Sequence, residues 1–153
     1  MWEAGAGYGP SMKIEDVIRK KGTGVVTITP TATVAELVDL LGKNNIGAVV
    51  VSVDGATISG IVSERDVVRH LASDGAAVLS QPISAIMTAE VKTCTGEDDI
   101  EDTAHTMTYS RIRHLPVVRD DHLVAIVSIG DVVKHRIDQL TDERNHLLGY
   151  LHA

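Results

Sequence analysis

Apolar and polar residues follow two patterns along the chain, and these predict helices and strands in a regular order. Apolar residues at intervals of three and four predict a helix whose buried face is formed by Val34, Leu37, Val38 and Leu41. Thr33 and Glu36 form a capping box at its start. Short apolar runs at 25–28, 46–53 and 57–62 predict strands, and Asp54-Gly55 predicts a hairpin turn between the last two.

The same order of elements occurs a second time, because residues 60–70 reappear 65 positions later as residues 125–135. Seven of the eleven positions are identical, and both copies contain an apolar run, a Ser-x-x-Asp motif and an apolar pair. Strands are predicted again at 91–95, 112–118 and 123–127, with a helix that begins after Asp99. The duplication predicts two small repeats of one architecture.

The Ser-x-x-Asp motif, at Ser63 with Asp66 and at Ser128 with Asp131, has two interpretations. In the first, it starts a helix, because the serine caps free N–H groups and the aspartate suits the helix dipole. In the second, the helix N-terminus faces a ligand and attracts phosphate, while the carboxylate accepts both hydroxyls of a ribose. The duplication alone does not decide between them.

Composition and charge narrow the classes of function. A chain of 153 residues and 16.3 kDa, of which 44% are apolar, suits one compact domain or two repeats with a shared core. The net charge of −7 provides no general basic surface for nucleic acid or an anionic membrane. We expect no metal site, because the single cysteine excludes a multi-cysteine cluster. We expect a cytoplasmic protein, because there is no apolar run of membrane-spanning length and no signal peptide. The basic run 19–21 is interpreted as a solvated helix end.

Several motifs in register carry a resemblance to a known family. They are Val-Thr-Ile-Thr-Pro at 26–30, Asn-Ile-Gly-Ala-Val-Val-Val at 45–51, Gly-Ile-Val-Ser-Glu-Arg-Asp at 60–66, Ile-Met-Thr at 86–88, Arg-Ile-Arg-His-Leu-Pro-Val-Val at 111–118 and Ile-Val-Ser-Ile-Gly-Asp-Val-Val-Lys at 126–134. Together they resemble a tandem pair of cystathionine-β-synthase (CBS) domains, also called a Bateman module. The chain is similar in particular to stand-alone bacterial proteins that consist of such a pair and a C-terminal helix.

This resemblance implies an α+β fold in which two β-α-β-β-α repeats pack about a pseudo-twofold axis, with ligand clefts between them. We predict a flexible N-terminal tail at 1–12, the first CBS repeat at 13–72, a linker at 73–82, the second repeat at 83–137 and a C-terminal helix at 138–153.

In the family, the clefts bind adenosine compounds, most often AMP, ADP or ATP, with the motif hydroxyl near phosphate and the aspartate on the ribose. The opposite repeat helps to hold the adenine. For one cleft the resemblance implies Ser128, Asp131, Ile126, Ile28, Thr29, Ala35, Ile46, Gly47 and Ala48. For the other it implies Ser63, Asp66, Ile61, Arg65, Cys94, Thr95, Ile112, Arg113 and His114.

The two implied clefts are not equivalent. Arg113-His114 matches the family's basic pair near the phosphates, although these two residues alone would also suit a solvated strand end. Gly47-Ala48 has no charge at the matching position but would let a flat ring approach the backbone. The second motif also has Ala125 in the place of Gly60. Cys94 by itself is interpreted as a small buried hydrophobe.

The resemblance implies a regulatory module that senses adenosine nucleotides, requires no cofactor and signals to an unknown effector protein. We do not expect an enzyme, because no serine or cysteine has a base and an orienting partner in register, and no Gly-rich loop cradles a nucleotide. One alternative is a nucleotide-processing enzyme with Asp66 or Asp131 as its base. Another is a structural dimerisation module with empty clefts.

Assembly into a homodimer is a further expectation. The two motif helices, at 64–71 and 129–137, each have an apolar pair, and a C-terminal stripe adds Leu140, Leu147 and Leu151. Large exposed apolar patches are uncommon on monomers, and a twofold dimer would cover these residues. Tandem pairs of the family commonly dimerise through the same helices.

Overall fold

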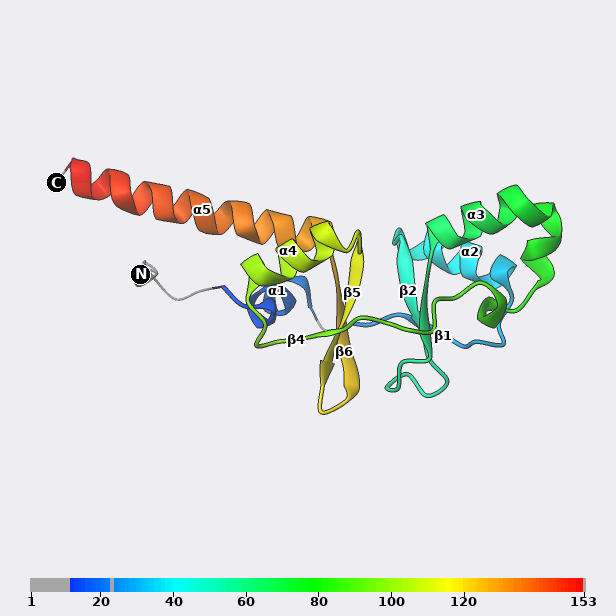
Figure 1. The fold of residues 1–153 in the computed structure, drawn as a ribbon. Helices are drawn as coiled ribbons and strands as arrows, with labels where there is room; N and C mark the ends of the chain where they lie inside the picture. The colour runs from blue at the N-terminus through cyan, green and yellow to red at the C-terminus, as the bar shows by residue number, and fades with distance from the viewer. Residues whose placement is uncertain (1–11, 23, 153) are drawn as a thin grey trace. The chain divides into compact units, whose positions relative to one another are not determined.

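The computed structural model describes residues 12–22 and 24–152 (Figure 1). Except for Met12, the predicted tail at 1–12 lies outside the described residues. The described chain divides into two compact units. Unit 1 contains residues 12–22, 94–117 and 126–152, and unit 2 contains residues 24–93 and 118–125.

Unit 2 is built on a three-stranded sheet. β1 (Thr27–Ile28) pairs parallel with β2 (Ala48–Val51), and β2 pairs antiparallel with β3 (Gly60–Ser63). α2 (Val34–Asn44) connects β1 to β2, and α3 (Glu64–Asp74) follows β3 directly. Two short 3-10 helices, Gly75–Ser80 and Ile83–Ala85, follow α3. The predicted linker at 73–82 therefore has helical structure for most of its length.

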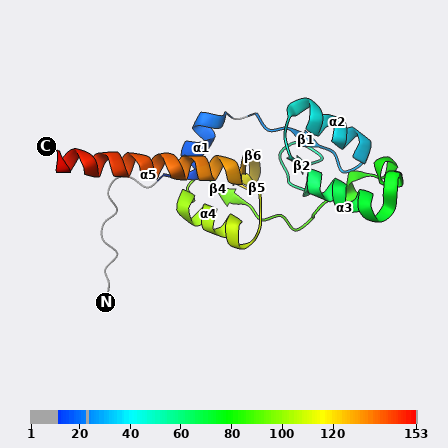
Figure 2. The ribbon, with the colours of Figure 1, turned by 90° about the horizontal axis from the view of Figure 1, so that it is seen from above.

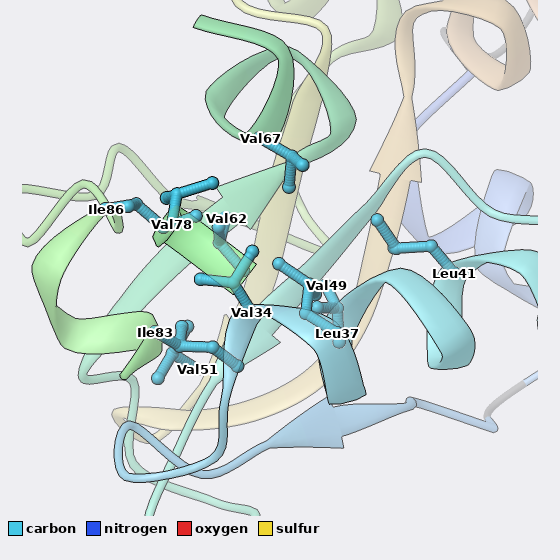
Figure 3. Close-up of a cluster of buried hydrophobic side chains, with 10 residues drawn as sticks. All are labelled: Val34, Leu37, Leu41, Val49, Val51, Val62, Val67, Val78, Ile83 and Ile86. Carbon is cyan, nitrogen blue, oxygen red and sulfur yellow. The ribbon is translucent and has the colours of Figure 1, made fainter. Parts of the chain in front are cut away.

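The core of unit 2 consists of aliphatic side chains, as expected for a sequence without phenylalanine. Three of the four predicted face residues of α2 are buried, whereas Val38 is 44% exposed. Val78, from the predicted linker, is fully buried, so this segment contributes to the core. Figure 3 shows the cluster: Val34, Leu37, Leu41, Val49, Val51, Val62, Val67, Val78, Ile83 and Ile86.

The second sheet has the order β4-β5-β6, with β4 at Cys94–Thr95, β5 at His114–Arg119 and β6 at His122–Ser128. α4 (Ile100–Tyr109) connects β4 to β5. α5 (Ile129–Leu151) follows β6 directly as one continuous helix, so the second motif helix and the C-terminal stripe belong to the same element. Two three-stranded sheets with helices confirm the predicted α+β class.

The first helix, α1 (Ile14–Lys21), packs in unit 1. Its first amide donates to the Asp98 carbonyl at 2.9 Å, and the Ile100 amide donates to the Met12 carbonyl at 3.0 Å. Ile14 and Val17 are fully buried. α1 and α4 both lie against the N-terminal part of α5, and the C-terminal part of α5 extends beyond them (Figures 1 and 2). Within the described residues, no helix combines the length and the apolar character needed to cross a membrane.

Candidate functional site

Each Ser-x-x-Asp motif forms the N-terminus of the helix that follows its sheet. In unit 2, the Ser63 hydroxyl accepts the Asp66 amide at 3.4 Å, and Asp66 Oδ2 accepts the Ser63 amide at 2.8 Å and the Ser63 hydroxyl at 3.1 Å. This is a reciprocal capping box, which satisfies N–H groups that a helix start leaves unpaired. The capping interpretation is therefore confirmed at this motif, and it does not exclude a ligand.

The second motif repeats this geometry in unit 1. The Ser128 hydroxyl accepts the Asp131 amide at 3.1 Å, and Asp131 Oδ2 accepts the Ser128 amide at 2.9 Å. The first helical amide also has a matching partner in each unit, because the Ile129 amide donates to Arg113 at 2.8 Å and the Glu64 amide donates to Gly47 at 2.9 Å. Arg113 is thus attached through its carbonyl to the start of α5.

The two helix starts differ because a lysine side chain donates to the Asp131 carboxylate at the start of α5. Lys21, the last residue of α1, donates from Nζ to Asp131 Oδ2 at 2.5 Å and to the Ile126 carbonyl at 3.1 Å. The Lys21 and Asp131 side chains are 41% and 28% exposed. Lys21 is exposed at the helix end, as the interpretation of 19–21 predicts, but that interpretation does not include its ion pair with Asp131. Among the described residues, Asp66 has no basic partner of this kind.

Asp131 is charged at neutral pH. Partial burial raises the pKa of its carboxyl group, but the hydrogen bonds from Lys21 and from the Ser128 backbone outweigh this effect and hold the pKa below its usual value. Because the folded-state pKa is the lower one, the stabilising contribution of Asp131 is present above about pH 4 and is lost as the pH falls further. Within the described residues its contacts use Oδ2, so Oδ1 remains an acceptor.

Cys94 has the character of a packing residue. Its side chain is buried, and burial together with the nearby Asp98 charge raises the pKa of the thiol to about 12. A thiol with a pKa this high is protonated at neutral pH and is a weak nucleophile. No group of three or more histidine, cysteine or acidic side chains suited to a metal ion occurs in the part of the chain that the structure describes.

The other predicted site residues fall into both units. In unit 1, Arg113 and Thr95 are exposed, and Ile112, Ile126 and His114 are half-buried. In unit 2, Thr29, Ala35 and Arg65 are exposed, Ile28, Ile46, Gly47 and Ile61 are half-buried, and Ala48 is buried. Each implied cleft combines residues of one unit with residues of the other, so the full cleft compositions remain predictions.

Two residues near Asp131 were missed by sequence reasoning, Lys21 and His135. His135 is 6% exposed, and its Nδ1 lies 2.8 Å from the Asp131 carbonyl. Since a carbonyl only accepts, the proton is assigned to Nδ1, which makes Nε2 a buried acceptor that has no partner in the described chain. The repeat provides a partial indication of His135, because His70 occupies the matching position. Nothing in the sequence indicates the contact of Lys21, since its partner lies 110 positions away.

Comparison with known proteins gives consistent matches along most of the chain. The family model described as CBS domain matches residues 14–73 and 83–138. A mitochondrial CBS domain-containing protein of Arabidopsis thaliana is 34% identical over 149 residues, which cover 92% of this chain and 72% of that protein.

Solved structures match over similar lengths. A CBS-domain containing protein from Agrobacterium tumefaciens has a TM-score of 0.78 and 41% identity, and the match covers 81% of this chain and 98% of that one. A CBS domain protein from Pyrobaculum aerophilum, complexed with AMP, has a TM-score of 0.69 and 29% identity over 78% of this chain and 88% of that one.

Proposed function

The chain belongs to the CBS domain family, with two repeats at 14–73 and 83–138, and on that premise we propose that it is a regulatory module that binds an adenosine nucleotide. AMP, ADP or ATP is the ligand class, and the bound state is signalled to a partner protein. The AMP complex of the Pyrobaculum aerophilum relative supports this ligand class. The single observation that carries the proposal is the start of α5, where Asp131 is ionised and keeps Oδ1 as an acceptor.

The chemistry of this helix start suits a nucleotide. A carboxylate only accepts hydrogen bonds, and a ribose offers two hydroxyl donors, so Asp131 is matched to the sugar. Phosphate is favoured at a helix N-terminus by the dipole and by the N–H groups. In the other implied cleft, which contains Asp66, the exposed Arg113 side chain adds a positive charge for the phosphates.

A binding role is also better supported than catalysis. General bases work best with a pKa near the operating pH, and the lowered pKa of Asp131 makes it a weak base at pH 7. Cys94 is buried and the pKa of its thiol is raised, which makes it a poor nucleophile at pH 7. A module with this chemistry binds its nucleotide and releases it unchanged.

The proposal is tested by titrating the purified protein with AMP, ADP and ATP in a calorimeter and then analysing the nucleotide by chromatography. We expect saturable binding and complete recovery of the added compound. Conversion of the nucleotide would favour the enzyme alternative. No binding heat and no shift in melting temperature with any of the three would favour a structural module with empty clefts.

We also propose that the chain forms a homodimer. Val67 and Val132 are buried within their own units, whereas their neighbours Val68 and Val133 are exposed. Along α5 the exposed apolar side chains continue at spacings that fit a heptad seam: Val133, Ile137, Leu140, Leu147 and Leu151. A second copy of α5 is the occupant that such a seam fits, because identical seams are self-complementary about a twofold axis.

Light scattering should report about twice the chain mass of 16.3 kDa. The double substitution Leu140→Asp with Leu147→Asp should reduce this to the monomer mass, because it places charges in the seam. The matched control, Thr141→Asp with Asn145→Asp, adds the same charges to other exposed positions of α5 and should leave the dimer intact. A monomer mass for the unaltered protein, with and without nucleotide, would rule out the dimer.

A further inference from the structure

The C-terminal turn of α1 ends in three basic residues that differ in their contacts. Arg19 stays on its own helix, with its guanidinium 3.5 Å from Glu15 and 3.4 Å from Asp16. Lys21 instead reaches α5, where its Nζ lies 2.5 Å from Asp131 Oδ2 and 3.1 Å from the Ile126 carbonyl. Lys21 therefore ties the end of the first helix to the carboxylate to which we assign the ribose.

The ammonium group and the Ser128 amide together occupy Oδ2, one of the two acceptor oxygens of Asp131. A ribose could therefore use Oδ1 freely but must displace Lys21 to reach both oxygens. We propose that Lys21 is an internal competitor of the ribose: it occupies Asp131 in the free protein and is released when an adenosine compound binds. This inference rests on the proposed function, because it takes Asp131 as the ribose acceptor.

The exchange is energetically accessible. Both side chains are partly exposed, so Lys21 regains hydration when it leaves, and exposed ion pairs of this kind are weak. A lysine on a flexible four-carbon stem can also swing away without moving the backbone. Displacement therefore lowers ligand affinity only moderately, by the cost of breaking the Lys21–Asp131 pair.

Release of Lys21 would also change α1. A helix of eight residues is too short to be stable alone, and α1 is held at its start and middle by buried Ile14 and Val17. At its end, the contacts of Lys21 with Asp131 and Ile126 hold the helix in place. Loss of these contacts would let the last turn of α1 unwind. Occupancy of the site is thereby converted into fraying of a defined segment, which is a signal that a partner protein can detect.

Removal of the competitor should tighten binding. We expect Lys21→Met to bind adenosine about two- to fivefold more tightly than the unaltered protein, the range that an ion pair of modest strength corresponds to. Lys20→Met removes the same charge from the same turn at an exposed position and should leave the affinity unchanged. The gain should be absent for 2′,3′-dideoxyadenosine, which lacks the 2′ and 3′ hydroxyls that Asp131 would accept, and absent when Asp131→Ala is combined with Lys21→Met.

Hydrogen exchange supplies a second measurement. Amides of the last turn of α1 should exchange faster when adenosine is added to the unaltered protein, and should already be fast in Lys21→Met. If the unaltered protein binds adenosine but Lys21→Met binds it equally or more weakly, the competitor role is overturned. Weaker binding of ATP with unchanged binding of adenosine would make Lys21 a phosphate contact instead. If neither protein binds any adenosine compound, the proposed function fails and the competitor role fails with it.

Discussion

Replacing Asp131 by alanine is expected to weaken the binding of adenosine nucleotides by about 1.5–3 kcal/mol, or about 10- to 150-fold in Kd. The reason is that a hydrogen bond to a charged acceptor is worth more than a neutral one, and Asp131 is ionised at neutral pH. The free energy of unfolding should fall by only about 1 kcal/mol, since the substitution removes a capping contact and a partly exposed ion pair. Calorimetric titration and urea denaturation measure the two quantities separately.

Two further substitutions serve as controls for this result. Asp66→Ala removes the equivalent capping contact from α3 and should cost a similar free energy of unfolding without changing affinity at the Asp131 site. Arg113→Ala should weaken ATP and ADP more than adenosine, because its assigned partner is phosphate. If Asp131→Ala leaves the affinity unchanged but lowers stability strongly, the motif is a helix cap and nothing more.

Helix starts could be predicted from the sequence because the interactions that form them span three residues. Thr33 accepts the Glu36 amide at 3.1 Å, and Glu36 accepts the Thr33 amide at 3.3 Å, as the capping box requires. Both motif serines cap their helices in the same way. The family and the α+β class were likewise predictable, since the motifs that identify them are contiguous stretches of sequence.

The connection between β2 and β3 was predicted less well. Asp54-Gly55 predicts a tight hairpin, but pairing of the two strands begins only at Val51 and Gly60. The Asp54 carboxylate accepts the amides of Ala56 and Thr57 at 2.8 and 2.7 Å, which lowers the pKa of Asp54 and closes the loop on itself. A side chain that competes for backbone donors in this way shortens the strands, and periodicity does not reveal it.

Contacts between segments far apart in the chain could not be predicted from the sequence, for a different reason. The apolar face at Ile14 and Val17 indicates that α1 must be covered, but it does not indicate by which element. The repeat boundaries place α1 with the first repeat, whereas its backbone bonds go to Gly96 and Asp98, next to β4. The approach of Lys21 to Asp131 depends on that packing, so it could be found only in the structure.

The two repeats also differ at one matching position, where the first has Gly60 and the second has Ala125. A Cβ at residue 60 would lie 2.8 Å from the Met87 sulfur and 2.8 Å from the Thr88 carbonyl oxygen. The methionine side chain can move, but the Thr88 carbonyl accepts the Ile61 amide at 3.0 Å and is fixed by that bond. Unlike Ala125, which is buried with its side chain already accommodated, residue 60 therefore has to be glycine.

Gly60→Ala should accordingly lower the free energy of unfolding by about 1–3 kcal/mol, the usual cost of forcing an extra carbon into a packed site. Gly42→Ala is the matched control: nothing lies within 4 Å of its Cβ position, and it lies within α2, so it should stabilise the protein by up to about 1 kcal/mol. Urea denaturation at one protein concentration compares the two. Equal stability of Gly60→Ala and the unaltered protein would mean that residues 87–88 can withdraw from β3 at no cost, and that the pairing of Ile61 with Thr88 contributes little to unit 2.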